Sequence, residues 1–379
     1  MALSMRSSPA RNSAAGWRHV DLSLLLATIG ISGIGLLMVF SSTRQKQIAS
    51  GLDPAFFVKR QAVFFVLGIV VLGVATLVDY RRIQEFTPIL YGGALLVLLL
   101  VLSPLGASRR GTQAWFQLGP YQLEPSELSK LVLILTLAAV CAGYKGDLDT
   151  RGLLVVLGLA AVPMGLIFLQ PDLGTDMVFV AILMGVLLVA GAKPRHIAAL
   201  TLVGITGVIM VAQLGMLKDY QADRLSAFLD PQADSQRSSY NLRQSQIAIA
   251  AGGVAGRGLF QGTQTNLSFV PEQHTDFIFT AVGEELGFIG GVSLLGFFGV
   301  IVWRTWRAAV LARDQLGRLI CVGVLAMFVF QLFENVGMTM GITPITGIPL
   351  PFMSYGGSAT IASFLGIGLV LNVHMRRFS

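Results

Sequence analysis

The stretch LSLLLATIGISGIGLLMVF, residues 22–40, decides the fold class of this chain. It contains no charged side chain, and a helix of this length crosses a hydrocarbon core about 30 Å thick. The run is too long for the apolar core of a secretory signal peptide, and no small-residue cleavage site follows it. We therefore interpret it as a first transmembrane helix that stays in the membrane.

The rest of the chain repeats this pattern. Of its 379 residues, 54% are hydrophobic and 12% are charged, and the mean hydropathy is +0.71. A soluble domain averages about 45–50% apolar and about 25% charged residues. The sequence therefore predicts an all-α polytopic membrane protein with about ten transmembrane helices. The expected spans are residues 22–41, 61–78, 86–104, 127–143, 152–169, 175–191, 197–216, 276–301, 318–340 and 356–374.

The domain organisation is expected to be simple. Residues 1–21 form a basic, Ser/Ala-rich tail, and no change of composition marks a separate soluble domain after it. We predict one transmembrane domain over residues 22–376.

The net charge of +7 would suit a nucleic-acid partner in a soluble protein. In a membrane protein it indicates basic loops that face anionic lipid headgroups, so we expect membrane lipid and no nucleic acid as the partner of this charge. Most of the 27 Lys and Arg residues lie on short segments that share a side with the N-terminus. The positive-inside rule then predicts that both termini are cytoplasmic.

In this orientation two polar connections, about residues 105–126 and 217–275, face outward. The second, between spans seven and eight, is far longer than an ordinary connector, and loops of this size are usually functional or disordered. Within it, SYNLRQSQIAIAAGGVAGRG (residues 239–258) is an amphipathic stretch that ends in glycine-rich turns. We expect it to lie along the membrane surface.

Ionisable side chains inside membrane spans are costly and usually face a bundle interior or a water-filled cavity. In EPSELSKLVLIL, Ser126 is expected to cap a helix whose first turns carry Glu127 and Lys130. Their spacing of three residues places both on one helix face as a pair. The residues alone leave open whether this pair is a structural salt bridge or part of a functional site.

The start of span eight reads PEQHTDFIFTAVGEELGFIGG, residues 271–291. We expect Thr275 to be the N-cap of this helix and Asp276 to lie in its first turn. Asp276, Gly283 and Gly287 would share a face, which permits close approach of a partner helix or a lipid substrate. An anion at a helix start is also favoured by about 0.3–1 kcal/mol, and the residues alone favour this structural explanation.

Three further polar pairs occur in or between spans. The first lies away from the Asp276 face and is expected to contact another helix. The second predicts a tight extracellular turn, and the third predicts interhelical hydrogen bonds. The pairs are Glu284 and Glu285, Asp172 and Asp176, and Glu334 and Asn335.

Several chemistries have no support in the sequence. The four histidines are scattered, and there is no HExxH or paired Cys-x-x-Cys motif, so we expect no zinc site. There is no G-x-x-x-x-G-K-[ST] loop, so we expect no nucleotide cofactor. Cys141 and Cys321 lie in apolar runs, where cysteines usually serve packing.

Four blocks of sequence, in a fixed order along the chain, carry a resemblance to a known family. They are residues 111–131 (GTQAWFQLGPYQLEPSELSKL), 170–177 (QPDLGTDM), 240–290 and 335–359 (NVGMTMGITPITGIPLPFMSYGGSA). Together they resemble the SEDS family (shape, elongation, division and sporulation) of integral-membrane peptidoglycan glycosyltransferases, over the chain from about residue 20 to its end. GTQ at 262–264 and the block from residue 341 resemble the elongation branch, RodA, rather than the division branch, FtsW.

The resemblance implies a ten-span protein of the bacterial cell membrane that polymerises lipid II on its outer face. The family's essential aspartate falls on Asp276, within HTDFIF, and its Glu/Lys pair falls on Glu127 and Lys130, within PSELSK. A basic residue after the first external loop corresponds to Arg60. Many relatives have an arginine before the tryptophan where this chain has Ala114, so Arg109 or Arg110 would have to replace it. His274 and Thr275 complete the candidates for substrate binding or support.

The implied reaction needs a base near the attacking sugar hydroxyl and positive charge near the departing diphosphate. Asp276 is the expected base, and Arg60, Arg109, Arg110 and Lys130 are candidates for the charge. A divalent cation, Mg or Mn, with Asp276 as a ligand, is an alternative, since an all-oxygen site leaves almost no sequence signature. The resemblance also implies a class B penicillin-binding protein, a transpeptidase, as partner. A lipid II flippase and a non-catalytic scaffold are the competing functions.

Overall fold

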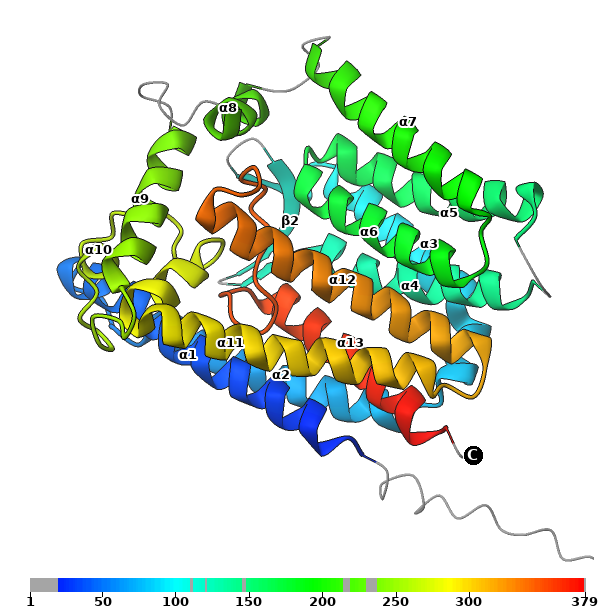
Figure 1. Cartoon of the computed structure of the whole chain (residues 1–379), viewed down its shortest axis with the longest axis horizontal. Helices are drawn as coiled ribbons and strands as arrows, with labels where there is room; N and C mark the ends of the chain where they lie inside the picture. The colour runs from blue at the N-terminus through cyan, green and yellow to red at the C-terminus, as the bar shows by residue number, and fades with distance from the viewer. Residues whose placement is uncertain are drawn as a thin grey trace, which may run out of the picture.

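The computed structural model describes residues 20–109, 112–119, 121–144, 148–213, 219–229 and 237–377. Long helices run roughly parallel and antiparallel to one another in a single bundle (Figure 1). The long helices are α1 (Leu22–Ala49), α2 (Phe56–Leu77), α3 (Tyr80–Val101), α4 (Pro125–Ala142), α5 (Thr150–Leu169), α6 (Leu173–Val189), α7 (Pro194–Gln213), α11 (Ile278–Val310), α12 (Gln315–Met340) and α13 (Gly357–Met375).

Each expected span overlaps one of these helices, although α1 continues eight residues beyond the expected end at residue 41 and α11 continues nine residues beyond the expected end at residue 301. Among the described residues, 8 helices are long and apolar enough to cross a membrane, and α6 is a shorter apolar helix of 17 residues. The chain is therefore a multi-pass membrane protein. A total of ten crossings, with α6 and α7 included, stays a prediction.

The bundle has a centre and a periphery. In α13 and α4, 78% and 72% of the most apolar window is buried inside the protein, whereas in α3 the share is 11%. Glycines let the central helices approach closely, because a Cβ on Gly323 of α12 would lie 2.6 Å from a methyl carbon of Ile134 on α4. The outer helices α2, α3 and α5 present leucine, valine and isoleucine outward, as lipid-facing helices do.

The all-α fold class is confirmed, and one connection of the bundle contains short strands. Between α3 and α4, the strands β1 (Ala107–Arg109), β2 (Thr112–Leu118) and β3 (Tyr121–Leu123) form an antiparallel sheet in the order β1-β2-β3. The Gln113 side chain donates to the carbonyl oxygens of Val101 (3.0 Å) and Ser103 (2.9 Å), which ties the sheet to the end of α3. Extended backbone pairs its own polar groups here, outside the apolar spans.

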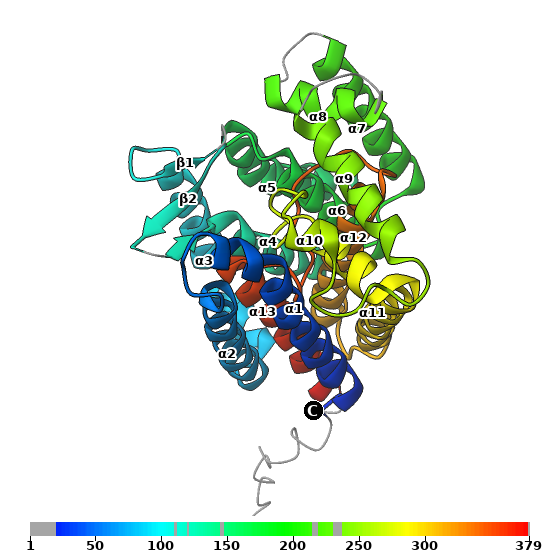
Figure 2. The same cartoon turned by 90° about the vertical axis from the view of Figure 1, so that its left-hand side faces the viewer.

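The long connection before α11 contains α8 (Asp219–Leu229), α9 (Arg237–Gly252) and the single turn α10 (Thr263–Asn266). Figure 1 shows α9 running across the direction of α11, and Figure 2 shows α9 and α10 in front of the end of the bundle. The Ser245 hydroxyl donates to the carbonyl oxygen of Thr339 at the end of α12, at 2.6 Å. The helical, crosswise arrangement agrees with a segment that lies along the membrane surface.

Helix α11 is interrupted at Gly287, whose φ of +66° and ψ of −163° are not helical. Residues 253–258 fill the break: Phe288 N donates to Gly253 O at 2.9 Å, and Gly258 N donates to Glu285 O at 3.0 Å. A Cβ on Gly252 would lie only 1.9 Å from the carbonyl oxygen of Gly283. Gly283 and Gly287 do permit a close approach, but the approaching segment is the chain's own glycine-rich turn rather than the expected partner helix or lipid substrate. The expected common face with Asp276 is absent, because Asp276 precedes the helix and Gly287 breaks it.

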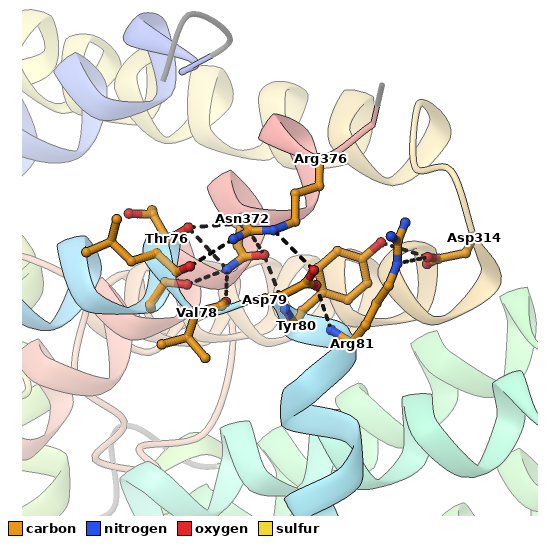
Figure 3. A network of polar contacts seen from close by, with 10 residues as sticks. Thr76, Val78, Asp79, Tyr80, Arg81, Asp314, Asn372 and Arg376 are labelled. Atoms are coloured by element: carbon orange, nitrogen blue, oxygen red, sulfur yellow. Dashed lines mark hydrogen bonds and ion pairs between the residues drawn. The ribbon is translucent and has the colours of Figure 1, made fainter. Parts of the chain in front are cut away.

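At the opposite end of the bundle, a polar network joins the α2–α3 turn to α13 and to the α11–α12 turn (Figure 3). The Asn372 amide on α13 donates to the carbonyl oxygens of Ala75 (2.5 Å) and Val78, which end α2. The Tyr80 hydroxyl donates to Asp314 at 2.8 Å, and Asp314 also accepts from Gly317 N and so caps α12. This network holds two inter-helix turns and the end of α13 together.

Replacing Asn372 by leucine should destabilise this end of the bundle. The carbonyl oxygens at the end of α2 would keep their buried positions but lose their donor, at about 1–3 kcal/mol for each unsatisfied group. Thermal unfolding of purified protein in nanodiscs measures the effect. Thr201→Leu, on the exposed face of α7, is the matched control and should unfold like wild type. Equal melting temperatures for Asn372→Leu and wild type would contradict the stated role.

Candidate active site

Asp276 lies in a turn before α11 rather than in its first helical turn. The expectation that Thr275 caps this helix is wrong, because α11 begins at Ile278 after the N-cap Phe277. The Thr275 hydroxyl points backward and donates to the carbonyl oxygen of Glu272 at 3.1 Å, and Asp276 N donates to the same oxygen at 3.2 Å. Glu272 has a φ of +54°, so the turn takes a backbone path that helix-cap rules do not anticipate.

The main chain of Asp276 is fixed by Asn335 of α12. The Asn335 amide donates to Asp276 O and to Ile348 O, at 2.8 Å each. Asn335 is expected from the sequence to form hydrogen bonds between helices, but both of its acceptors lie in connecting segments. It also joins the Asp276 turn to the segment of residues 341–356 that links α12 to α13. The Asp276 side chain is half-buried at this end of the bundle.

An arginine that sequence reasoning did not select lies beside this carboxylate. A Cβ on Gly347 would lie 3.3 Å from Asp276 Oδ2 and 3.7 Å from both Nη1 and Nη2 of Arg224. Arg224 comes from α8, and its Nη1 donates to the carbonyl oxygen of Thr346 at 2.9 Å. The only signal in the sequence is a basic residue within the long polar connection, and nothing there indicates that it returns to Asp276.

His274 packs among aromatic rings rather than toward other ligating side chains. Its ring centroid lies 5.0 Å from that of Phe57 on α2 and 5.6 Å from that of Tyr355. Tyr355 N donates to His274 O at 2.9 Å. His274 and Thr275 therefore shape the turn that presents Asp276.

Arg60 lies on α2 over two aromatic rings. Its guanidinium carbon is 4.1 Å from the centroid of the Phe56 ring and 5.5 Å from that of Tyr121 on β3. Cation–π contacts of this kind hold a guanidinium in place. Arg60 is thus a cation placed where α2 meets the sheet.

The two arginines proposed to replace the missing one can be placed only in part. Arg109 is the last residue of β1, and Arg110 falls outside the described residues. Ala114 is fully buried in β2, where its small side chain fits. Its neighbour Trp115 donates through Nε1 to Glu124 Oε2 at 3.1 Å.

Glu127 and Lys130 form the expected salt bridge, with 2.7 Å between Nζ and Oε1, and 3% and 1% of the two residues are exposed. The expectation that Ser126 caps α4 is wrong: Pro125 is the first helical residue, and the residue before it is Glu124. Proline fits this position because its missing N–H would have no partner there. The pair is enclosed in protein rather than placed among headgroups.

Glu124 is a second residue that sequence reasoning did not select. It links the sheet to two helices, because its carboxylate accepts from Trp115 and Ser126 and its N–H donates to Ser358 Oγ at 2.9 Å. Burial, and then the negative charges of Glu127 and Asp172, raise the pKa of Glu124 to about 8.

Three other carboxylates near this end, Glu284, Glu285 and Asp172, have structural partners. Glu284 accepts from the N–H groups of Gln264 (2.7 Å) and Thr265 (2.9 Å) and so caps α10. Glu285 accepts from the Ser41 hydroxyl of α1, which confirms the contact expected with another helix. Asp172 caps α6 by accepting from Thr175 N at 3.1 Å, as a residue of a tight turn does.

This part of the fold thus presents one half-buried aspartate, an arginine beside it, and further cations on α2 and α4. Within the described ranges, no three His, Cys, Asp or Glu side chains gather as they would to hold a metal ion. The protein alone therefore does not build a closed metal cage in the region described. Carboxylate and guanidinium groups at a bundle end suit proton transfer beside an anionic substrate.

A family model described as cell cycle protein, which covers FtsW, RodA and SpoVE, matches residues 22–378. The chain belongs to the SEDS family. It is 36% identical to Stage V sporulation protein E of Bacillus subtilis over 93% of this chain and 96% of that protein. It is 33% identical to the probable peptidoglycan glycosyltransferase FtsW of Geobacter metallireducens, over 94% of this chain and 95% of that protein.

The SEDS chain is also 33% identical to the peptidoglycan glycosyltransferase MrdB of Escherichia coli, over 95% of this chain and 94% of that protein. A solved structure described as structural coordination of polymerization and crosslinking by a peptidoglycan synthase complex contains a similar chain. The two superpose with a TM-score of 0.81 at 33% identity, covering 96% of this chain and 100% of that chain. One family model covers FtsW, RodA and SpoVE together. These similarities therefore establish the SEDS family but do not assign the chain to one of its branches.

Proposed function

We propose that this SEDS protein is a peptidoglycan glycosyltransferase that polymerises lipid II into glycan strands and releases undecaprenyl diphosphate. The observation that carries the proposal is the position of Asp276. Its side chain is half-buried at one end of the bundle and lies beside Arg224, with both groups next to Gly347. The glycosyltransferase names of its relatives FtsW and MrdB support the same activity. The site would face the extracytoplasmic side of the bacterial cell membrane, in agreement with the distribution of basic residues.

In this reaction a sugar hydroxyl attacks the anomeric carbon of a second lipid-linked sugar. Asp276 takes the hydroxyl proton as the new C–O bond forms, and the bond to the diphosphate breaks with its electron pair on the diphosphate oxygen. Arg60 stabilises this negative charge, because a guanidinium binds phosphate through two parallel hydrogen bonds. Lys130 is buried in an ion pair with Glu127. We therefore assign it an indirect role, in which the pair holds α4 in place.

A divalent cation is a further part of the proposal. Magnesium commonly binds one or two protein carboxylates together with substrate phosphates rather than a protein-built cage. Asp276 with the lipid diphosphate provides such a donor set, and the bound ion would neutralise phosphate charge.

We infer elongation and cell shape as the biological setting, with a class B penicillin-binding protein as partner. The RodA-like motifs GTQ and GITPITGIPLPFMSYGG support the setting. The similar chain in a synthase complex that coordinates polymerization and crosslinking supports the partner.

The competing functions make different demands. A flippase needs polar groups near mid-membrane with access from both sides, whereas the candidate residues here gather at one end of the bundle. A scaffold has no need of an aspartate fixed beside an arginine.

The direct test is polymerisation of purified lipid II by the purified protein in nanodiscs, alone and with its class B penicillin-binding protein. We expect glycan strands on a gel, with more product when the partner is present. Transfer of lipid II across a vesicle bilayer without polymer would instead support the flippase. No polymer under either condition would contradict the proposal.

A further inference from the structure

Arg224 and Asp276 face a common space that a glycine leaves open. The two terminal guanidinium nitrogens of Arg224, Nη1 and Nη2, and Oδ2 of Asp276 lie within 4 Å of the position that a Cβ would take on Gly347. Gly347 has a φ of +81°, in the left-handed region that favours glycine. A side chain at this position would compete with both charged groups for the same space.

The guanidinium is fixed to the same framework as the aspartate. Arg224 Nη1 donates to Thr346 O, while Asn335 donates both to Ile348 O and to Asp276 O. Helix α8, which is distant in sequence, and α12 with the segment 341–356 that follows it therefore set the position of one cation relative to one carboxylate. A surface arginine with no role would not be expected to have its head group held by a main-chain carbonyl beside an acid.

The surroundings of Asp276 make a nearby cation useful. A Cβ on Gly174, at the start of α6, would lie 3.0 Å from Thr346 O, so the carboxylates of α6 are close to this segment. Titratable groups on the neighbouring elements include Glu272 and His274 on the same turn, Asp223 on α8, Glu334 on α12, and Asp172 and Asp176 on α6. Most of these groups are acids, and Arg224 adds to them a guanidinium that stays charged at any working pH.

We propose that Arg224 is a positioning residue that keeps the Asp276 carboxylate directed toward the attacking sugar hydroxyl. This inference rests on the proposed function of Asp276 as the base. It assigns α8, and thus the long connection before α11, a direct part in assembling the site.

The test compares Arg224→Gln and Arg224→Lys with wild type in lipid II polymerisation by purified protein in nanodiscs. We expect Arg224→Gln to lower kcat roughly tenfold with KM almost unchanged, since a 1 Å displacement of a reacting group can cost about a hundredfold. Arg224→Lys restores a cation and should recover part of kcat. An unchanged kcat for Arg224→Gln, or a raised KM at unchanged kcat, would overturn the proposal.

Two further variants separate this inference from the proposed function. Arg195→Gln removes an exposed arginine at the start of α7, at the opposite end of the helix bundle from Asp276, and should polymerise lipid II like wild type. If Asp276→Asn polymerises normally, the proposed function itself has failed. If Asp276→Asn is inactive and Arg224→Gln matches wild type, only the positioning role of Arg224 has failed.

Discussion

Asp276→Asn should lower the rate of lipid II polymerisation by about 10²- to 10⁴-fold, the range that general-base catalysis contributes. Asparagine is nearly the same size as aspartate but cannot take a proton at neutral pH. The Asn335 side chain donates to the main-chain oxygen of residue 276 and does not contact the side chain at that position through this bond, so the turn should be retained. The rate is measured with purified protein and lipid II under single-turnover and steady-state conditions.

Asp53→Asn is the matched control for this substitution. Asp53 precedes α2 at the same end of the bundle, is exposed, and pairs with the exposed Lys59 at 2.7 Å. We expect wild-type polymerisation from it, because exposed ion pairs contribute little. If Asp276→Asn and Asp53→Asn were equally active, Asp276 would not be the base. An intact melting profile for both variants excludes misfolding as the cause of a difference.

The elements that could be predicted from sequence are those set by local composition. Uncharged runs such as residues 22–40 predict helices, because a membrane-crossing backbone must satisfy its own hydrogen bonds. The Glu127–Lys130 pair was predictable for a similar reason, since both partners lie on one helix face. The resemblance of residues 274–279 to a family motif also directed attention to Asp276.

What could not be predicted depends on contacts between segments distant in sequence. Thr275 does not cap α11, because the Thr275 hydroxyl donates to the carbonyl oxygen of Glu272 instead, in a turn fixed by Asn335. Arg224 reaches Asp276 only because α8 returns to the segment around Gly347. The sheet between α3 and α4 is short, and its strands are held by Gln113 and by pairing rather than by a strong strand pattern.

Lys130→Met should destabilise the folded bundle by about 3–5 kcal/mol, because it leaves the buried Glu127 carboxylate without its partner. Unfolding in mixed micelles with increasing SDS measures this loss. The double variant Glu127→Gln/Lys130→Met removes both charges and should regain most of the stability, since a neutral pair of similar size avoids the uncompensated charge. A double variant that is stable but inactive in polymerisation would show that the reaction needs the charged pair, whereas a stable single variant would contradict the burial argument. The pair lies at the start of α4, one of the most buried helices, so the loss of stability should be felt across the bundle rather than at its rim.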